Sequence, residues 1–222
     1  MSKKYDVAIV GATGAVGEVL ISILDERNFP INNLYPLASK RSAGNKVNFQ
    51  GKSWLVEDLD AFDFSSVSEV FASVGPFDGL VSCIGSTPFK TFEELTMEDF
   101  ATGISTKCLS QLNLAKSAIP FLTENGSITL TSGIIGDEPI LAGACAAAAN
   151  GALNMCVSTL AAEYAGKLRI NIVSPSIIEN SVDYYGMLFD GFEPTSKESI
   201  IYAYRRTISA PITGRVLRLT RS

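Results

Sequence analysis

The 222-residue sequence contains no histidine. Nucleophile–histidine triads, histidine general bases and histidine metal ligands are therefore excluded together. Charged residues are also few, at 18%, and the net charge is −5. Nucleic acid and anionic membranes are thus poor candidates for the main partner. No run of 18 apolar residues occurs, and we expect no transmembrane helix.

Cysteine is scarce and shows no metal-binding or redox spacing. The four residues form no C-x-x-C pair and lie in apolar stretches, at Cys83, Cys108, Cys145 and Cys156. This pattern predicts reduced, buried thiols. The opening residues, MSKKYDV, lack the apolar core of a signal peptide and pass straight into an expected strand. We therefore expect a cytoplasmic protein.

The stretch around which the chain is organised is YDVAIVGATGAVG, at residues 5–17. Its pattern predicts a buried strand, a glycine turn and an amphipathic helix. Gly11 permits the tight turn, Gly14 lets the backbone approach a pyrophosphate, and Gly17 lets the helix pack near the strand. Free N–H groups at the helix start favour an anion, although three glycines alone also suit a tight turn into any helix. The residues expected to hold a dinucleotide here are Gly11, Thr13, Gly14, Ala15, Val16 and Gly17.

A basic loop at residues 39–44 follows the second expected strand, at 34–38. In an NAD-binding unit, an acidic residue near this place holds the ribose 2′-hydroxyl. Here the loop carries Ser39, Lys40, Arg41 and Ser42 instead, which suits the 2′-phosphate of NADP. The alternative is a solvated surface loop.

Strands and helices alternate along the rest of the chain. We expect strands at 80–84, 127–131, 169–173 and 216–219, and helices at 65–74 (capped by Ser66), 100–119, 141–165 and 197–208. Residues 47–56 add one or two short strands with a turn at Gly51. The alternation indicates a mostly parallel sheet covered on both faces. The fold class is α/β, a Rossmann-like doubly wound sheet in three αβα layers, and we expect one domain over residues 1–222.

From about residue 60 to 219 the sequence resembles the short-chain dehydrogenase/reductase family. The motifs that carry the resemblance are Ser82-Cys83-Ile84-Gly85 for that family's N-x-A-G segment, Thr131-Ser132-Gly133 for its catalytic serine, RINIVSP at 169–175 for its R-x-N-x-(V/I)-x-P-G segment, and ITGRV at 212–216. The resemblance implies the strand order 3-2-1-4-5-6-7 and a catalytic role for Ser132. It implies cofactor contacts at Asp60 for the adenine, at Cys83, Ile84 and Gly85 for the adenine ribose, and at Pro175, Ile177 and Asn180 for the nicotinamide.

From residue 4 to about residue 67 the sequence is similar to the start of aspartate-semialdehyde dehydrogenase. The matching segments are VAIVGATGAVG, Asn28-Phe29-Pro30 and LASKRSAG at 37–44. In that enzyme the last segment is an NADP 2′-phosphate site, in agreement with the charge of the loop. The enzyme's catalytic cysteine and histidine lie in a later domain, and this chain has no histidine. The resemblance therefore implies cofactor binding without the semialdehyde chemistry.

Two such halves are typical of a recombined or engineered chimera with a junction near residues 58–70. The alternative is a natural, divergent short-chain reductase whose first part resembles the other family.

The proton-transfer pair of the short-chain family is missing. That family uses a tyrosine as general acid/base and a lysine four residues later, which lowers the tyrosine pKa. Counting back from Gly151-Ala152-Leu153 places Ala146 at the tyrosine position and Asn150 at the lysine position. Alanine has no proton to give, and asparagine carries no charge that would lower a pKa. The family's structural asparagine falls near Ser105 or Thr106, so only Ser132 remains of the four.

Other residues replace this pair poorly. Tyr164 and Lys167 lie several turns away on the same helix. Tyr184 and Tyr185 belong to a segment, 182–194, that has the composition of a lid, where packing aromatics are the commoner role. Lys107 is near the asparagine position, but because it lies up to two residues further along a helix, its side chain is expected to point away from that position.

The sequence thus predicts an NADP(H)-binding protein of the short-chain reductase type with weak or no turnover, acting on a small carbonyl or alcohol if on anything. We expect a homo-oligomer that associates through the helices at 100–119 and 141–165. The rival hypothesis is a chimeric scaffold with neither ligand nor activity.

Overall fold

The computed structural model describes residues 3–220. Seven parallel strands form one sheet in the order β5-β2-β1-β6-β7-β8-β9. Numbered within this sheet alone, the order is 3-2-1-4-5-6-7, so the predicted topology is confirmed. The strands are β1 Tyr5–Val10, β2 Ile31–Ala38, β5 Glu57–Asp58, β6 Phe77–Ser82, β7 Leu122–Thr131, β8 Arg169–Pro175 and β9 Val216–Leu219.

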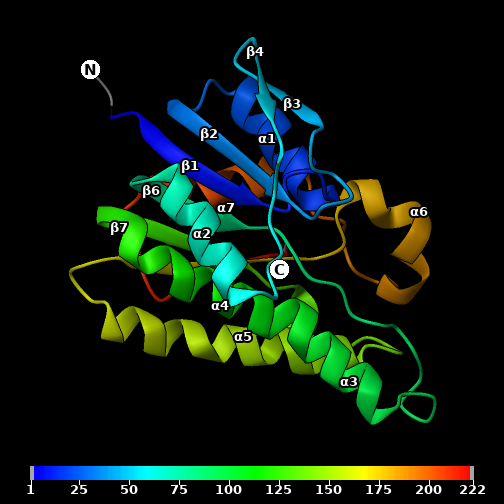
Figure 1. Cartoon of the computed structure of the whole chain (residues 1–222). Helices are drawn as coiled ribbons and strands as arrows, with labels where there is room; N and C mark the ends of the chain where they lie inside the picture. The colour runs from blue at the N-terminus through cyan, green and yellow to red at the C-terminus, as the bar shows by residue number, and fades with distance from the viewer. Residues whose placement is uncertain (1–2, 221–222) are drawn as a thin grey trace.

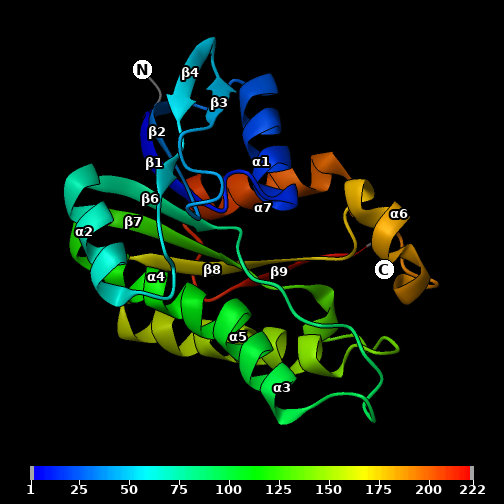
Figure 2. The same ribbon diagram turned by 45° about the vertical axis from the view of Figure 1, so that its right-hand side comes forward.

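Helices cover both faces of the sheet (Figures 1 and 2). One face is covered by α1 (Ala15–Glu26) and α7 (Lys197–Ser209), and the other by α2 (Phe64–Val74), α4 (Ser110–Ala118) and α5 (Ala144–Glu163). Successive residues of a strand point to opposite faces, so β1 supplies Val7 and Ile9 to one core and Ala8 and Val10 to the other. This confirms the predicted three-layer α/β architecture.

The helix predicted at 100–119 is built differently. It begins at Met97, because the Thr96 hydroxyl accepts the Asp99 amide in a capping box. It then runs as α3 (Met97–Gly103), a π-helical turn η1 (Ile104–Leu109) and α4, and ends in a short 3₁₀ turn η2 (Ile119–Phe121). The π-helical turn inserts one extra residue per turn, which the apolar spacing of the sequence does not reveal.

Other boundaries also differ from the prediction. α2 begins at Phe64, because the Asp63 carboxylate accepts the Ser65 amide at 2.9 Å, so the predicted cap at Ser66 is wrong. β2 and β7 begin several residues earlier than predicted, and β6 lies at 77–82 rather than 80–84. α5 is shorter at both ends than the predicted 141–165.

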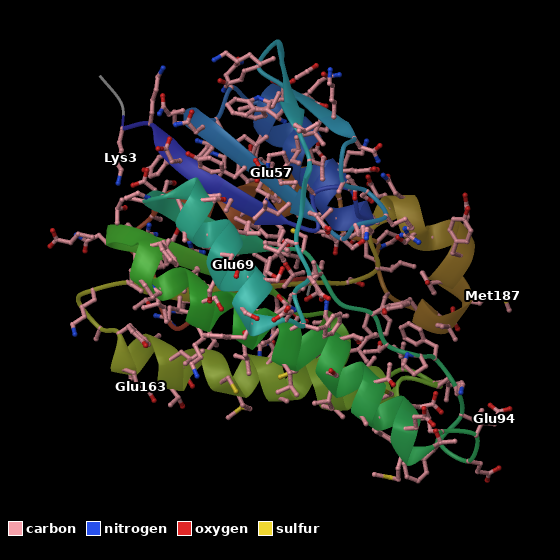
Figure 3. The ribbon with its side chains drawn as sticks, viewed as in Figure 1. Lys3, Glu57, Glu69, Glu94, Glu163 and Met187 are labelled. Carbon is pink, nitrogen blue, oxygen red and sulfur yellow. The ribbon has the colours of Figure 1, made fainter. Side chains whose placement is uncertain are left out.

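Smaller elements complete the fold. Where the sequence predicts one or two short strands over residues 47–56, two strands, β3 (Lys46–Phe49) and β4 (Lys52–Leu55), pair as an antiparallel hairpin. Short helical turns occupy η3 (Ile134–Gly136), η4 (Glu179–Ser181), α6 (Val182–Tyr185) and η5 (Gly186–Phe189). The last three form a segment beside the sheet's carboxyl edge, with Met187 projecting outward (Figure 3). All four cysteines are free. Cys108 and Cys145 are buried as predicted, whereas Cys83 and Cys156 are only partly buried, so full burial is wrongly predicted for these two.

α5 is long and apolar enough to cross a membrane by length and composition alone. In the fold, however, Ala149, Leu153 and Val157 are buried, the last two in the core against the sheet. This is the environment of a core helix.

Arg169 and Asn171 of β8 have a structural role. The Arg169 guanidinium donates to the carbonyl oxygens of Thr207, Ile208 and Ala210, between 2.7 and 2.9 Å, at the end of α7. The Asn171 side chain bonds the Ile212 carbonyl and the Arg215 amide. These contacts fix the crossover from α7 to β9, because they satisfy carbonyl groups that a helix end leaves free.

Candidate functional site

The turn after β1 is shaped by glycines that have no room for a side chain. Gly11 has a φ of +82°, and a Cβ there would lie 2.8 Å from the Cys83 carbonyl oxygen. A Cβ on Gly17 would overlap the Gly11 carbonyl oxygen, to which the Gly14 amide donates at 3.0 Å. The turn is a compact cradle, in which Gly11 makes the turn and Gly17 lets α1 pack beside β1.

The start of α1 is open to an anion. Gly14 is the N-cap and supplies no side-chain hydrogen bond, so the N–H groups of the first turn have no capping partner from it. Ala15 is exposed, and Thr13 and Val16 are half-buried. Such a helix start favours a phosphate group. Binding at these residues stays a prediction.

The basic loop lies next to this cradle. The Gly11 amide donates to the Leu37 carbonyl oxygen of β2 at 2.8 Å, so the turn after β1 and the loop after β2 are neighbours. Ser39 and Arg41 are exposed and Ser42 is half-buried. Within residues 3–220, Arg41 takes part in no ion pair. Its guanidinium is therefore available to an external anion.

The ends of β5 and β6 hold the other residues matched to adenosine contacts. Asp60 is exposed, and its carboxylate accepts the Phe62 amide at 3.0 Å, so one oxygen shapes the turn before α2. Cys83 donates its amide to the Val10 carbonyl at 2.8 Å, next to Ile84. Gly85 has a φ of +107°. The predicted adenine and ribose roles remain untested.

A pocket of about 270 Å³ opens at the carboxyl edge of the sheet. Of the residues predicted as site residues, it is lined by Ala15, Val16, Gly85, Ser132, Pro175 and Ile177. The structure thus brings together the start of α1 and the loops after β6, β7 and β8. The predicted residues outside its lining are Gly11, Thr13, Gly14, Gly17, Ser39, Arg41, Ser42, Asp60, Cys83, Ile84 and Asn180.

The positions matched to the serine, tyrosine and lysine share this pocket. The Ser132 amide donates to the Val173 carbonyl at 3.0 Å, and Ala146 and Asn150 of α5 also line the pocket. The Asn150 side-chain nitrogen donates to the Ala146 carbonyl at 2.9 Å. In the described part of the chain, the Ser132 hydroxyl oxygen and the Asn150 side-chain oxygen have no hydrogen-bond partner. Of the eight such buried side-chain atoms among the described residues, those of Ser132, Asn150 and Ser176 belong to residues that line this pocket. Because buried polar atoms usually have partners, this wall is a place for a ligand or water.

Lys107 lines the same pocket, so the prediction that it points away is wrong. It lies within the π-helical turn η1, where the angular spacing of residues differs from that of an α-helix. Burial lowers the pKa of its ammonium to about 8, partly offset by the nearby Cys83 thiol. Nothing in the sequence signals this placement, because neither Gly85 nor the residues of η1 form a recognised π-helix motif.

Of the remaining candidate residues, some line the pocket and others lie outside it. Tyr185 lines the pocket and its ring lies 5.7 Å from that of Phe89, whereas Tyr184 is exposed outside it. Ser181, not its neighbour Asn180, reaches the lining. Tyr164 and Lys167 follow the far end of α5, and neither lines the pocket.

A buried hydrogen-bond chain lies behind the pocket. Thr131 donates to the Ser82 carbonyl at 2.6 Å and shares a 2.6 Å hydrogen bond with the Tyr204 hydroxyl, which accepts the Cys83 thiol at 3.8 Å. Burial raises the pKa of Cys83 to about 11 and that of Tyr204 well above its usual value. Both groups are therefore neutral at physiological pH and act as structural links.

Two family models match the chain. Residues 55–204 match the model described as enoyl-(acyl carrier protein) reductase, and residues 6–77 match that of the semialdehyde dehydrogenase NAD binding domain. The second match agrees with curated relatives. Aspartate-semialdehyde dehydrogenase of Legionella pneumophila is 56% identical over 75 residues, and the USG-1 protein homolog of Pseudomonas aeruginosa is 54% identical over 71. These matches cover 34% and 32% of this chain but only 22% and 21% of those relatives.

Solved structures match nearly the whole chain. A protein from Listeria innocua is 29% identical with a TM-score of 0.82, covering 96% of this chain and 98% of its own. A small-chain dehydrogenase in complex with NADPH is 23% identical with a TM-score of 0.77, covering 98% of this chain and 97% of its own. At that identity the second structure supports the fold alone.

The cradle geometry predicts opposite effects of one substitution at two helical glycines. Gly17→Ala should lower the melting temperature, because its Cβ would overlap the Gly11 carbonyl and overpacking costs about 1–3 kcal/mol. Gly151→Ala in α5 is the matched control: its Cβ would lie 3.7 Å from the nearest atom, and alanine is the better helix former. Thermal unfolding of both variants checks this, and an unchanged Gly17→Ala melting temperature would contradict the cradle.

Proposed function

The chain belongs to the short-chain dehydrogenase/reductase family, and on this basis we propose that it is an NADP(H)-binding protein of the oxidoreductase type with weak or no turnover. One observation carries the proposal. The Gly11 amide bonds the Leu37 carbonyl at 2.8 Å, which places the glycine cradle and the basic loop side by side. A pyrophosphate at the first and a 2′-phosphate at the second would then belong to one dinucleotide.

The residues present fit this cofactor. Because Gly11 and Gly17 have no side chains, the cradle stays open; a Cβ at either position would clash with neighbouring backbone. The start of α1 offers free N–H groups. Arg41, Ser39 and Ser42 supply a cation and two hydroxyls at the end of β2, where residues 37–44 include no acid. This composition favours NADP over NAD. The structural neighbour in complex with NADPH is consistent with that choice, whereas the matching family model names NAD.

Bound NADPH would supply a hydride, and this chain would supply the pocket for a small carbonyl or alcohol. Ser132 can donate one hydrogen bond to a substrate oxygen. Ala146 has no proton to give, and Asn150 has no charge with which to lower the pKa of a neighbouring acid. The usual tyrosine–lysine proton transfer is therefore missing, and losing such acid/base catalysis costs about 10²–10⁴ in rate.

The second candidate is a chimeric scaffold without ligand or activity. The overlap of the two family matches at residues 55–77 favours a composite origin with a junction near 58–70. Titration of NADPH separates the candidates: a real site raises stability by about 2.7 kcal/mol at a hundredfold excess over Kd, and a scaffold shows no shift. We propose a cytoplasmic setting, consistent with four free cysteines.

Arg41→Ala should weaken NADPH binding and leave NADH binding nearly unchanged. Removing a charge-assisted contact costs about 1.5–3 kcal/mol, or roughly ten- to a hundredfold in Kd. Lys46→Ala removes an exposed cation from β3, outside the loop, and serves as the control. Cofactor fluorescence titrations measure both. Equal losses for both cofactors in Arg41→Ala would show that Arg41 does not contact the 2′-phosphate.

Turnover on ketones, alcohols and aspartate semialdehyde should be negligible. Ala146→Tyr with Asn150→Lys should raise NADPH oxidation against a panel of carbonyl compounds, because both positions line the pocket with Ser132. Ala146→Phe with Asn150→Lys matches the bulk without the hydroxyl. A normal reductase rate in the unmodified protein would show that another group transfers the proton.

We further propose that the chain forms a homodimer or homotetramer. A groove of about 690 Å³ lies between the outer sides of α4 and α5, and Met155 beside it is 74% exposed. Exposed apolar surface of this kind marks an interaction site. Light scattering should return a multiple of 23.7 kDa, and a clean monomer mass rules the proposal out.

A further inference from the structure

The pocket at the carboxyl edge carries an unbalanced positive charge. Among the described residues that line it, Lys107 is the only charged one. In the described part of the chain, its ammonium makes no ion pair or hydrogen bond. The residue is half-buried. Since an unpaired charge partly removed from water is costly, this arrangement favours an anionic ligand that completes the pair.

The backbone holds Lys107 in place. A Cβ on Gly85 would lie 2.7 Å from the Lys107 Cα, so the loop after β6 packs directly on η1. The Gln111 side chain donates to the carbonyls of Lys107 at 2.9 Å and Thr131 at 2.8 Å, and accepts the Thr131 amide at 2.9 Å. One buried amide thus ties the lysine to the end of β7, directly before Ser132.

Three residues with unpartnered polar atoms belong to the same wall of the pocket. Ser132, Asn150 and Ser176 line the pocket and are only 4%, 4% and 5% exposed. Within residues 3–220, the two serine hydroxyl oxygens and the Asn150 side-chain oxygen lack hydrogen-bond partners. Two hydroxyl donors and one ammonium from residues lining one pocket suit a carboxylate, and the Asn150 oxygen suits a donor on the ligand.

The rest of the wall is apolar. Ile134, Ile177 and Phe189 line it, and the rings of Phe89 and Tyr185 lie 5.7 Å apart at its rim. A single cation balances a single negative charge, whereas a phosphate dianion would leave uncompensated charge against this apolar wall.

We propose that this pocket binds a small carboxylate with an apolar body, whose acid group is held by the Lys107 ammonium and the Ser132 and Ser176 hydroxyls. The claim that such a carboxylate is the substrate rests on the function proposed above. The claim that the pocket binds a carboxylate rests only on the residues that line it, and it is tested separately from NADPH binding.

Affinity should depend on pH through Lys107. Its lowered pKa, about 8, means that the ammonium loses its charge as the pH rises above 8, and carboxylate binding weakens with it. The titratable group that acts on Lys107 is Cys83, at the end of β6. Cys83 in turn contacts Tyr204 of α7, and Tyr185 lines the same pocket. Burial keeps the pKa of Cys83 at about 11 and that of Tyr204 well above its usual value.

The test compares phenylacetate with phenylacetamide, its neutral isostere, by calorimetric titration of the full chain with and without NADPH. At pH 7, phenylacetate should bind about ten- to a hundredfold more tightly. That preference should fall between pH 8 and 10. Lys107→Met should abolish it, while Lys46→Met, which removes an exposed cation from β3, should preserve it. Ser132→Ala should weaken the binding of phenylacetate and leave the binding of phenylacetamide unchanged.

Equal affinities for acid and amide in the unmodified protein, or no binding of either, would overturn the proposal. So would a Lys107→Met variant that loses NADPH as strongly as phenylacetate, because the lysine would then hold the cofactor. If Lys107→Met does not fold, the pH dependence of the unmodified protein decides. Failure of NADPH to bind while phenylacetate still does would refute the proposed function and leave the carboxylate site standing.

Discussion

Parallel pairing of β1 with β2 on one side and β6 on the other is the constraint on which the site depends. It directs all three strands to end at the same edge. The Gly11 amide then meets the Leu37 carbonyl of β2, and the Gly11 Cα meets the Cys83 carbonyl beyond β6. A one-residue slip would turn every side chain of a strand to the opposite face. The two buried cores exclude such a slip, so the cradle, the basic loop and the pocket keep their relative positions.

A second close backbone contact defines the pocket wall. Gly85, with its positive φ, lets the loop after β6 lie against η1, and Gln111 connects that turn to the end of β7. π-Helical turns occur often at functional sites, because they re-aim side chains without breaking a helix. Here the turn presents Lys107 to the same space as Ser132, Ala146 and Asn150. The site has thus gained a cation from a different helix from the one that carries the matched tyrosine and lysine positions.

The two family matches meet inside one sheet. β1 and β2 lie within the semialdehyde-type match, and β7 and β8 lie within the reductase-type match. β6, at their boundary, pairs with both β1 and β7. The sheet is continuous across the two matches because β1, β6 and β8 share one apolar core through Ile9, Val81 and Val173.

The sequence by itself determined the fold class, the strand order and the backbone roles of Gly11 and Gly17. Hydrophobic periodicity and glycine spacing are local signals, and each strand or turn carries its own. It also identified Ala146 and Asn150 as companions of Ser132, because family motifs preserve spacing. The caps at Asp63 and Thr96 are local contacts that the sequence analysis missed. The tertiary structure alone decided the early start of β2 and the placement of Lys107. Both depend on groups that meet across the fold: β2 pairs with β1 from Ile31 onward, and Gly85 and Gln111, 26 positions apart in the sequence, both contact Lys107 in the π-helical turn.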